Sequence, residues 1–91
     1  MNPITHIQDY AEELTALRRD IHAHPEIGFE ETRTAALVAG LLEGYGYAVH
    51  RGIGGTGLVG VLEGRSGEGR RIGLRAELDA LPIEEATNLP Y

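Results

Sequence analysis

The feature that most constrains this chain is a change in the spacing of its apolar residues at Gly46. Before Gly46, apolar residues recur at steps of three and four, which is the period of an amphipathic helix. After it, apolar residues alternate with polar residues and glycines, which is the period of a strand. The pattern predicts helices over residues 5–24 and about 30–45, then strands over residues 47–51, 58–63 and 71–78. The expected fold class is α/β, with two helices and then a three-stranded sheet.

The helix boundaries carry their own signals. Asn2 is a candidate N-cap with Pro3 at the first helical position, and Thr5 with Gln8 offers an alternative capping box. Pro25 disfavours helical geometry at the residue before it, so the first helix is expected to end there. Glycines that commonly end helices follow the second one, at Gly44 and Gly46.

The last two strands are expected to form an antiparallel hairpin, because residues 65–69 read Arg-Ser-Gly-Glu-Gly, a turn sequence. Residues 80–91 show no period, so no closing element follows the sheet. A sheet with helices on one face leaves its other face open, whereas domains usually have two or three packed layers. We therefore expect residues 1–91 to be an incomplete domain, the beginning of a larger one, although a homodimer would also supply the cover.

Composition excludes several classes of function. The 91 residues carry a formal charge of −6 with no basic run, which disfavours binding to nucleic acid or an anionic membrane. The absence of cysteine excludes disulfides, thiolate metal sites and a cysteine nucleophile. The N-terminal residues lack the cationic start of a secretory signal, and no apolar stretch is long enough to span a bilayer. We expect a cytoplasmic protein.

Two local patterns resemble binding motifs. Residues 52–57 match G-x-G-x-x-G, but a dinucleotide site needs a helix after the motif and a strand is expected here, so we interpret it as a glycine-rich connection. His22 and His24 could hold a metal only if the helix ends between them, with Glu26 as the nearby third ligand. The simpler interpretation is that either imidazole caps the end of the helix.

Glu77 and Asp79 form the most suggestive local pattern. Carboxylates two apart on a strand point to the same face, with Cα atoms roughly 6.5–7 Å apart. They lie at the end of the expected third strand, where ligand and catalytic groups gather in α/β proteins. The pair could bind a metal or hold a metal-binding histidine in place, or it could be a solvated pair at the end of an edge strand. Arg75, two residues before Glu77 on the same strand face, could form an ion pair with it. Glu84 and Glu85 are most simply solvated, and the single serine, Ser66, lies in the expected turn.

Three blocks of the sequence form a recognisable series. The first covers residues 17–31, Leu-Arg-Arg-Asp-Ile-His-Ala-His-Pro-Glu-Ile-Gly-Phe-Glu-Glu, the second covers residues 52–60, and the third, residues 75–83, reads Arg-Ala-Glu-Leu-Asp-Ala-Leu-Pro-Ile. Taken together, they resemble the M20D peptidase/amidohydrolase family, the hippurate hydrolase and N-acyl-amino-acid amidohydrolase group, and the third is similar to the family signature Arg-Ala-Asp-Met-Asp-Ala-Leu-Pro-Ile.

The resemblance implies a three-layer α/β/α zinc-exopeptidase domain and a hydrolase that cleaves the amide of N-acyl amino acids. It also implies divalent metal ions (zinc, manganese, cobalt or nickel) that polarise the carbonyl and activate water, with a glutamate as general base. The family's metal ligands lie after this signature, beginning with a Cys-Gly-His-Asp string, so none is assigned here. Asp79, and with it Glu77, matches a position that lines the site and supports its ligands.

The chain departs from the family at Glu77 and Leu78, where aspartate and methionine are usual. A longer carboxylate shifts its oxygens by about one methylene, which can disturb a tuned site. We expect residues 1–91 alone neither to bind metal tightly nor to catalyse. The alternative is a non-catalytic α/β module that dimerises or binds a protein through its open sheet face, and a small metal-binding domain using His22, His24 and Glu26 is a third hypothesis.

Overall fold

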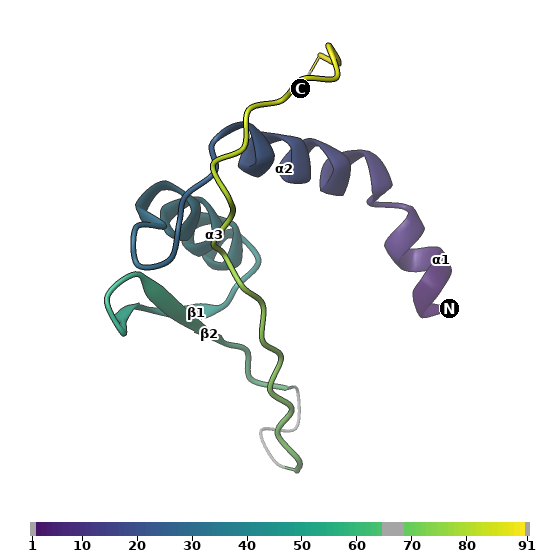
Figure 1. The fold of residues 1–91 in the computed structure, drawn as a ribbon. Coiled ribbons are helices and arrows are strands. Elements are labelled where there is room, and N and C mark those ends of the chain that lie inside the picture. The colour runs from purple at the N-terminus through teal and green to yellow at the C-terminus, as the bar shows by residue number, and fades with distance from the viewer. Residues whose placement is uncertain (1, 65–68, 91) are drawn as a thin grey trace. The chain divides into compact units, whose positions relative to one another are not determined.

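The computed structural model describes residues 2–64 and 69–90 (Figure 1). Its elements are α1 (Pro3–Gln8), α2 (Ala11–Ala23), α3 (Thr32–Gly44), β1 (Ala48–Ile53) and β2 (Gly57–Val61). The chain divides into two compact units, one of residues 1–25 with 82–91 and one of residues 26–81. The fold class is α/β, as the sequence predicts. No helix in the described parts is long and apolar enough to cross a membrane.

The first helix begins as predicted. The Asn2 side chain accepts the N–H of Ile4 at 2.9 Å, and Pro3 is the first helical residue. Proline suits this position because its missing N–H would have had no partner there. The N-terminal boundary is therefore confirmed as Asn2 and Pro3.

The continuity expected over residues 5–24 is wrong, because α1 and α2 are separate helices with a turn at Asp9 and Tyr10. Aspartate is a poor helix former since its side chain competes for backbone hydrogen bonds. The apolar stripe around the break is also exposed, so packing does not hold the two helices in one axis: the exposed fraction is 47% for Tyr10 and 50% for Leu14. The end of α2 at Ala23, just before Pro25, is as predicted.

Helix α3 lies within the range predicted for the second helix, and a left-handed glycine, Gly46, follows its end at Gly44 as expected. The backbone of Gly46 has a φ of 93°, a left-handed conformation that favours glycine. Its N–H donates to the carbonyl of Glu43 at 3.1 Å, and the N–H of Tyr47 donates to that of Leu42 at 3.0 Å. This pair of hydrogen bonds is the Schellman motif, which satisfies carbonyls left open at a helix end.

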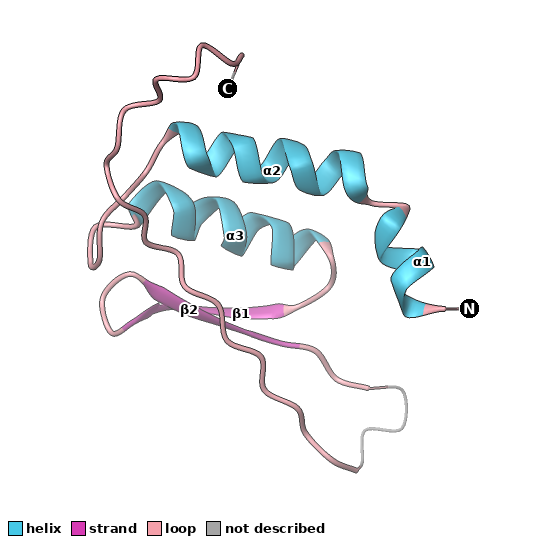
Figure 2. Cartoon of the chain, turned by 45° about the vertical axis from the view of Figure 1, so that its right-hand side comes forward, coloured by secondary structure: helices cyan, strands magenta, loops and turns pink. Residues whose placement is uncertain are grey.

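Strands β1 and β2 form an antiparallel hairpin in which Ala48 pairs with Val61 and Ile53 pairs with Gly57 (Figure 2). The strands expected over residues 47–51 and 58–63 are thus present with shifted bounds. One face of the hairpin packs on α3. The approach is close at Gly60, where a Cβ atom would lie 3.1 Å from Cδ1 of Leu42.

The third strand expected over residues 71–78, and its hairpin with the second strand, are wrong. Residues 70–80 are assigned no strand, and the sheet of the described chain has two strands in the order β1-β2. Alternation makes a segment extended, but a strand also needs a partner edge. Ile72 and Leu74, which alternate as predicted, are 87% and 96% exposed. The turn expected over residues 65–69, with Ser66, lies mostly outside the described residues, and the three-layer architecture stays a prediction.

Candidate functional site

Three segments of the second unit surround one open hollow of about 490 Å³. They are the loop before α3, the glycine-rich turn between β1 and β2, and the extended segment that follows the sheet. The lining residues are Gly28, Phe29, Glu31, Ile53, Gly54, Thr56, Gly57, Leu58 and residues 75–79. Each of the three blocks that carry the family resemblance therefore contributes to the same hollow.

The loop before α3 is fixed by Glu26. Its carboxylate accepts the N–H of Arg33 at 3.0 Å and the N–H of Thr34 at 2.6 Å, in the first turn of α3. These N–H groups have no partner inside the helix, and a negative charge is favourable at this end of the helix dipole. The Thr34 hydroxyl, followed by these two N–H groups, lowers the pKa of the Glu26 carboxyl. Glu26 therefore caps a helix that starts six residues later, so its interpretation as a metal ligand is not supported.

Glu31 joins the loop to the glycine-rich turn. Its carboxylate accepts the hydroxyl of Thr56, and it accepts the N–H of Phe29 at 2.8 Å. Glu31 is only 9% exposed, so the carboxylate needs these donors. The Thr56 hydroxyl is the main cause that lowers the pKa of the Glu31 carboxyl, against the opposing effect of burial. Two walls of the hollow are thereby held together by one buried side chain.

The extended segment forms the third wall and carries both predicted site residues, Glu77 and Asp79. One Arg75 guanidinium nitrogen lies 3.3 Å from Oε1 of Glu77, as expected for a neighbouring ion pair on the same face. The segment is tied to the loop by the N–H of Ala80, which donates to the carbonyl of Glu26 at 2.7 Å. The structure thus brings Glu77 and Asp79 to the hollow, while their role as site-lining groups stays a prediction.

The described residues do not form a metal site on their own. Within residues 2–64 and 69–90, no three histidine, aspartate or glutamate side chains are grouped so that they could hold a metal ion. Glu77 and Asp79 offer carboxylate oxygens, but a bound metal needs further ligands. We therefore assign no chemical step to a metal held by this chain alone.

The glycine-rich block is a connection between strands, as predicted. Gly52, Gly54 and Gly55 have φ values of 72°, 64° and 105°, which L side chains rarely adopt. The block leads directly into β2 and not into a helix. No helix N-terminus is available to bind a pyrophosphate, so the dinucleotide interpretation is excluded.

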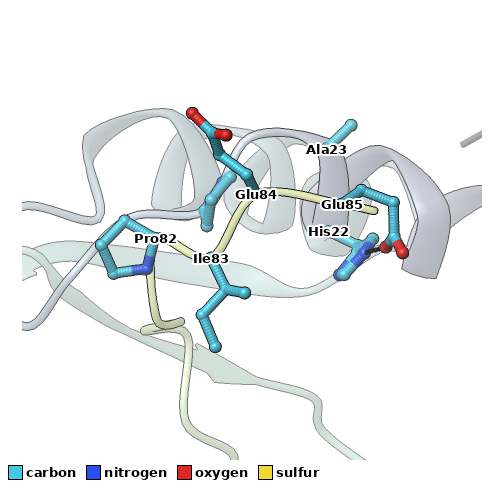
Figure 3. Close-up of a pocket in the computed structure, with 7 residues that line it drawn as sticks. His22, Ala23, Pro82, Ile83, Glu84 and Glu85 are labelled. Carbon is cyan, nitrogen blue, oxygen red and sulfur yellow. Dashed lines mark hydrogen bonds and ion pairs between the residues drawn. The ribbon is translucent and has the colours of Figure 1, made fainter. Parts of the chain in front are cut away.

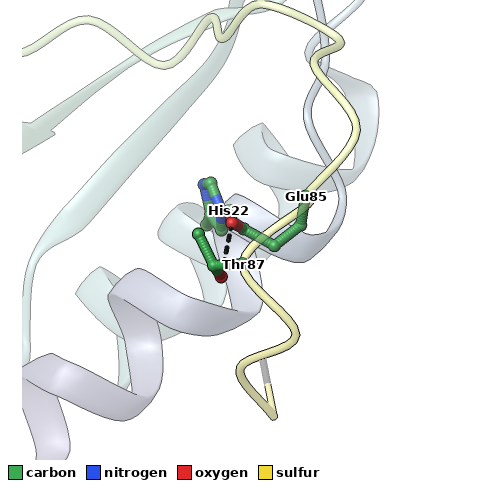
Figure 4. A network of polar contacts seen from close by, with 3 residues as sticks. All are labelled: His22, Glu85 and Thr87. Atoms are coloured by element: carbon green, nitrogen blue, oxygen red, sulfur yellow. Dashed lines mark hydrogen bonds and ion pairs between the residues drawn. The ribbon is translucent and has the colours of Figure 1, made fainter.

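A second hollow, of about 290 Å³, lies in the first unit and is lined by His22, Ala23, Pro25 and residues 82–85. Figure 3 shows the Glu85 carboxylate against His22, whereas Glu84 points away. The distance from Nε2 of His22 to Oε2 of Glu85 is 2.6 Å. The other carboxylate oxygen of Glu85 accepts the hydroxyl of Thr87 at 2.8 Å (Figure 4).

This contact bears on two expectations. Glu85 is exposed, as predicted, but its carboxylate also contacts His22 and Thr87, which lower its pKa. The helix-capping role predicted for either histidine belongs to His24, whose Nδ1 lies 3.0 Å from the Asp20 carbonyl oxygen. His22 instead reaches a carboxylate 63 residues away in the sequence.

Comparison with known proteins identifies relatives along the whole chain. It is 50% identical over 91 residues to the hippurate hydrolase of Campylobacter jejuni, covering 100% of this chain and 24% of that protein. It is 40% identical over 91 residues to thermostable carboxypeptidase 1 of Saccharolobus solfataricus, covering 99% of this chain and 22% of that one. It is 39% identical over 90 residues to the N-acetyl-L-cysteine deacetylase of Bacillus subtilis, covering 99% of this chain and 21% of that protein.

By name, these relatives are a hydrolase, a carboxypeptidase and a deacetylase. The chain belongs to the M20 peptidase/amidohydrolase family and corresponds to its N-terminal portion. It spans about a quarter of the length of these relatives. No family model and no solved structure matches the chain.

Proposed function

We propose that this sequence belongs to a metal-dependent amidohydrolase of the M20D group that hydrolyses the amide bond of N-acyl amino acids. The observation that carries the proposal is the 50% identity to a hippurate hydrolase over all 91 residues. The structure supports it, because the three blocks of the resemblance meet at one hollow. A hippurate-like substrate is the class we favour, since the relative with the highest identity among those named above is a hippurate hydrolase.

Within this proposal, residues 1–91 are part of a catalytic domain and contribute part of its site. Asp79 and Glu77 would line the site and orient the groups that bind the metals. A divalent metal would polarise the amide carbonyl and supply hydroxide near neutral pH. As the family resemblance implies, its ligands would come from segments after the signature at residues 75–83.

The test is to express the reading frame that contains this sequence, together with any codons that follow residue 91. We expect release of glycine from benzoylglycine in the presence of zinc, manganese, cobalt or nickel, and no turnover by the 91-residue chain alone. Asp79→Asn should lower kcat more than it changes KM, whereas Asp9→Asn, in the turn between α1 and α2, should change neither. Failure of the longer protein to hydrolyse any N-acyl amino acid with any of these metals would contradict the proposal.

A second candidate function is a non-catalytic module that dimerises or binds a protein. The observation that favours it is the near-complete exposure of Ile72 and Leu74, because exposed apolar groups often mark interaction surfaces. Sedimentation of the 91-residue chain would separate the candidates. A single dimeric species, lost in an Ile72→Ser and Leu74→Ser double variant, would favour the module. We also propose a cytoplasmic location, to be checked by cell fractionation.

A further inference from the structure

Among the described residues, Phe29 has neither the burial nor the backbone conformation that is usual for a large aromatic residue. It is the single phenylalanine of the chain, and it is 83% exposed. Burial is the usual reason for a large aromatic side chain at a given position, since it removes a large apolar area from water. The described residues do not cover the ring, which borders a hollow that also contains Glu77 and Asp79.

The backbone of Phe29 is also in an unfavourable conformation. Its φ is 66°, in the left-handed region where glycine and asparagine are at home and bulky residues are rare. The turn is held closed by the N–H of Glu30, which donates to the carbonyl of Ile27 at 3.0 Å. The buried carboxylate of Glu31 holds the N–H of Phe29 itself. A turn of this geometry alone would favour glycine or asparagine, so the aromatic ring needs another explanation.

The surroundings of the ring indicate which chemistry it would contact. Ile53, on the facing wall of the hollow, is also apolar and is 52% exposed. The charged groups of the hollow are one guanidinium, Arg75, and the carboxylates of Glu31, Glu77 and Asp79. Acids outnumber bases, so the carboxylate of a ligand would be repelled here. An uncharged apolar group fits the space beside Phe29 and Ile53 better.

We propose that Phe29 is a specificity-determining residue that contacts the acyl group of an N-acyl amino acid and favours aromatic acyl groups over acetyl. This inference rests on the proposed function for its substrate class. Aromatic rings attract one another beyond the effect of the area they bury. The structure supplies such a ring at the edge of the hollow, on a turn whose backbone N–H at Phe29 donates to Glu31, which is itself bonded to Thr56.

Because Phe29 is the single phenylalanine, 4-fluorophenylalanine would label this position alone in the 91-residue chain. The ¹⁹F resonance would be followed during titration with benzoylglycine and, separately, with acetylglycine. We expect a saturable shift with benzoylglycine and a Kd about three- to tenfold lower than that of acetylglycine. A response to tetramethylammonium larger than that to benzoylglycine would overturn the proposal, because a ring beside carboxylates also attracts cations.

The matched variant is Phe29→Asn, since asparagine tolerates the left-handed conformation and keeps the turn. In this variant, the amide signals of Gly54 and Thr56 should respond equally to the two ligands. The same variant in the protein from the longer reading frame should lose a three- to tenfold preference in kcat/KM for benzoyl over acetyl substrates.

An unchanged preference in the variant, or no ligand response at the label, would overturn the inference. Absence of hydrolysis with a preserved binding preference would instead contradict the proposed function and leave the inference standing. The two failures are therefore distinguishable.

Discussion

Gly57 is a position in the second unit where the addition of a single methyl group should strongly lower the free energy of unfolding. It pairs with Ile53 at the start of β2, beside the hollow. A Cβ atom at Gly57 would lie 2.5 Å from the carbonyl oxygen of Ile53, a separation that real Cβ atoms essentially never show. Since the neighbour is backbone and not the end of a side chain, relief requires the hairpin itself to move. We therefore expect Gly57→Ala to destabilise the unit.

The magnitude follows from the cost of overpacking, which is about 1–3 kcal/mol when atoms are forced into a filled space. The upper end applies to Gly57, because no rotamer change relieves the clash. A loss of about 3 kcal/mol would lower Tm by roughly 12–24 °C in a unit of this size. Urea unfolding of the variant and the unchanged chain, followed by circular dichroism at constant pH, would measure the loss in free energy of unfolding.

The control is Gly40→Ala in α3, where nothing lies within 4 Å of the added Cβ. Alanine should stabilise this helix by about 0.5–1 kcal/mol, because glycine loses more backbone entropy on folding. The two glycines receive the same methyl group, so the opposite signs isolate the contact with Ile53. A neutral or stabilising Gly57→Ala would refute the assigned hairpin register and turn.

Three further outcomes follow from polar contacts. Because the folded-state pKa values of Glu26 and Glu31 are lowered from the ordinary 4.5, their stabilisation is complete above pH 4.5 and is lost as pH falls through the lowered values. Unfolding free energies from pH 7 to 3 would show this loss, and a Glu26→Gln and Glu31→Gln double variant should show less of it. Asn2→Ala should cost α1 about 0.5–2 kcal/mol, with faster amide exchange in its first turn. His22→Ala should raise the Glu85 pKa toward 4.5 in a carboxyl NMR titration, whereas His50→Ala should not.

Sequence patterns predicted the elements whose signals are local. The Asn2 cap, the stop at Pro25 and the left-handed glycine after α3 each depend on a few neighbouring residues, and all are present. The prediction of a third strand was wrong because alternation specifies an extended backbone but not the neighbouring strand with which it would pair. The break at Asp9 was missed because the apolar period continues through it.

The residues of the candidate site also fall into two groups, those that a local pattern predicts and those brought together by contacts between distant parts of the sequence. Glu77 and Asp79 were identified from a spacing of two, a property of one short segment. Glu31 and Thr56 are 25 residues apart, and His22 and Glu85 are 63 apart, so no period in the sequence connects them. A turn signal at residues 27–30 could have been noticed, but the left-handed phenylalanine within it could not, because phenylalanine has no preference for that conformation.

The hollow itself shows why the resemblance and the structure support each other. Residues that match the family only as three separate strings become the walls of one space, joined by the Glu31–Thr56 contact and by the hydrogen bond from Ala80 to Glu26. Local secondary structure requires none of these long-range contacts. They bring three carboxylates, one guanidinium and one exposed aromatic ring to the same hollow, so residues from all three blocks can act on a single ligand there.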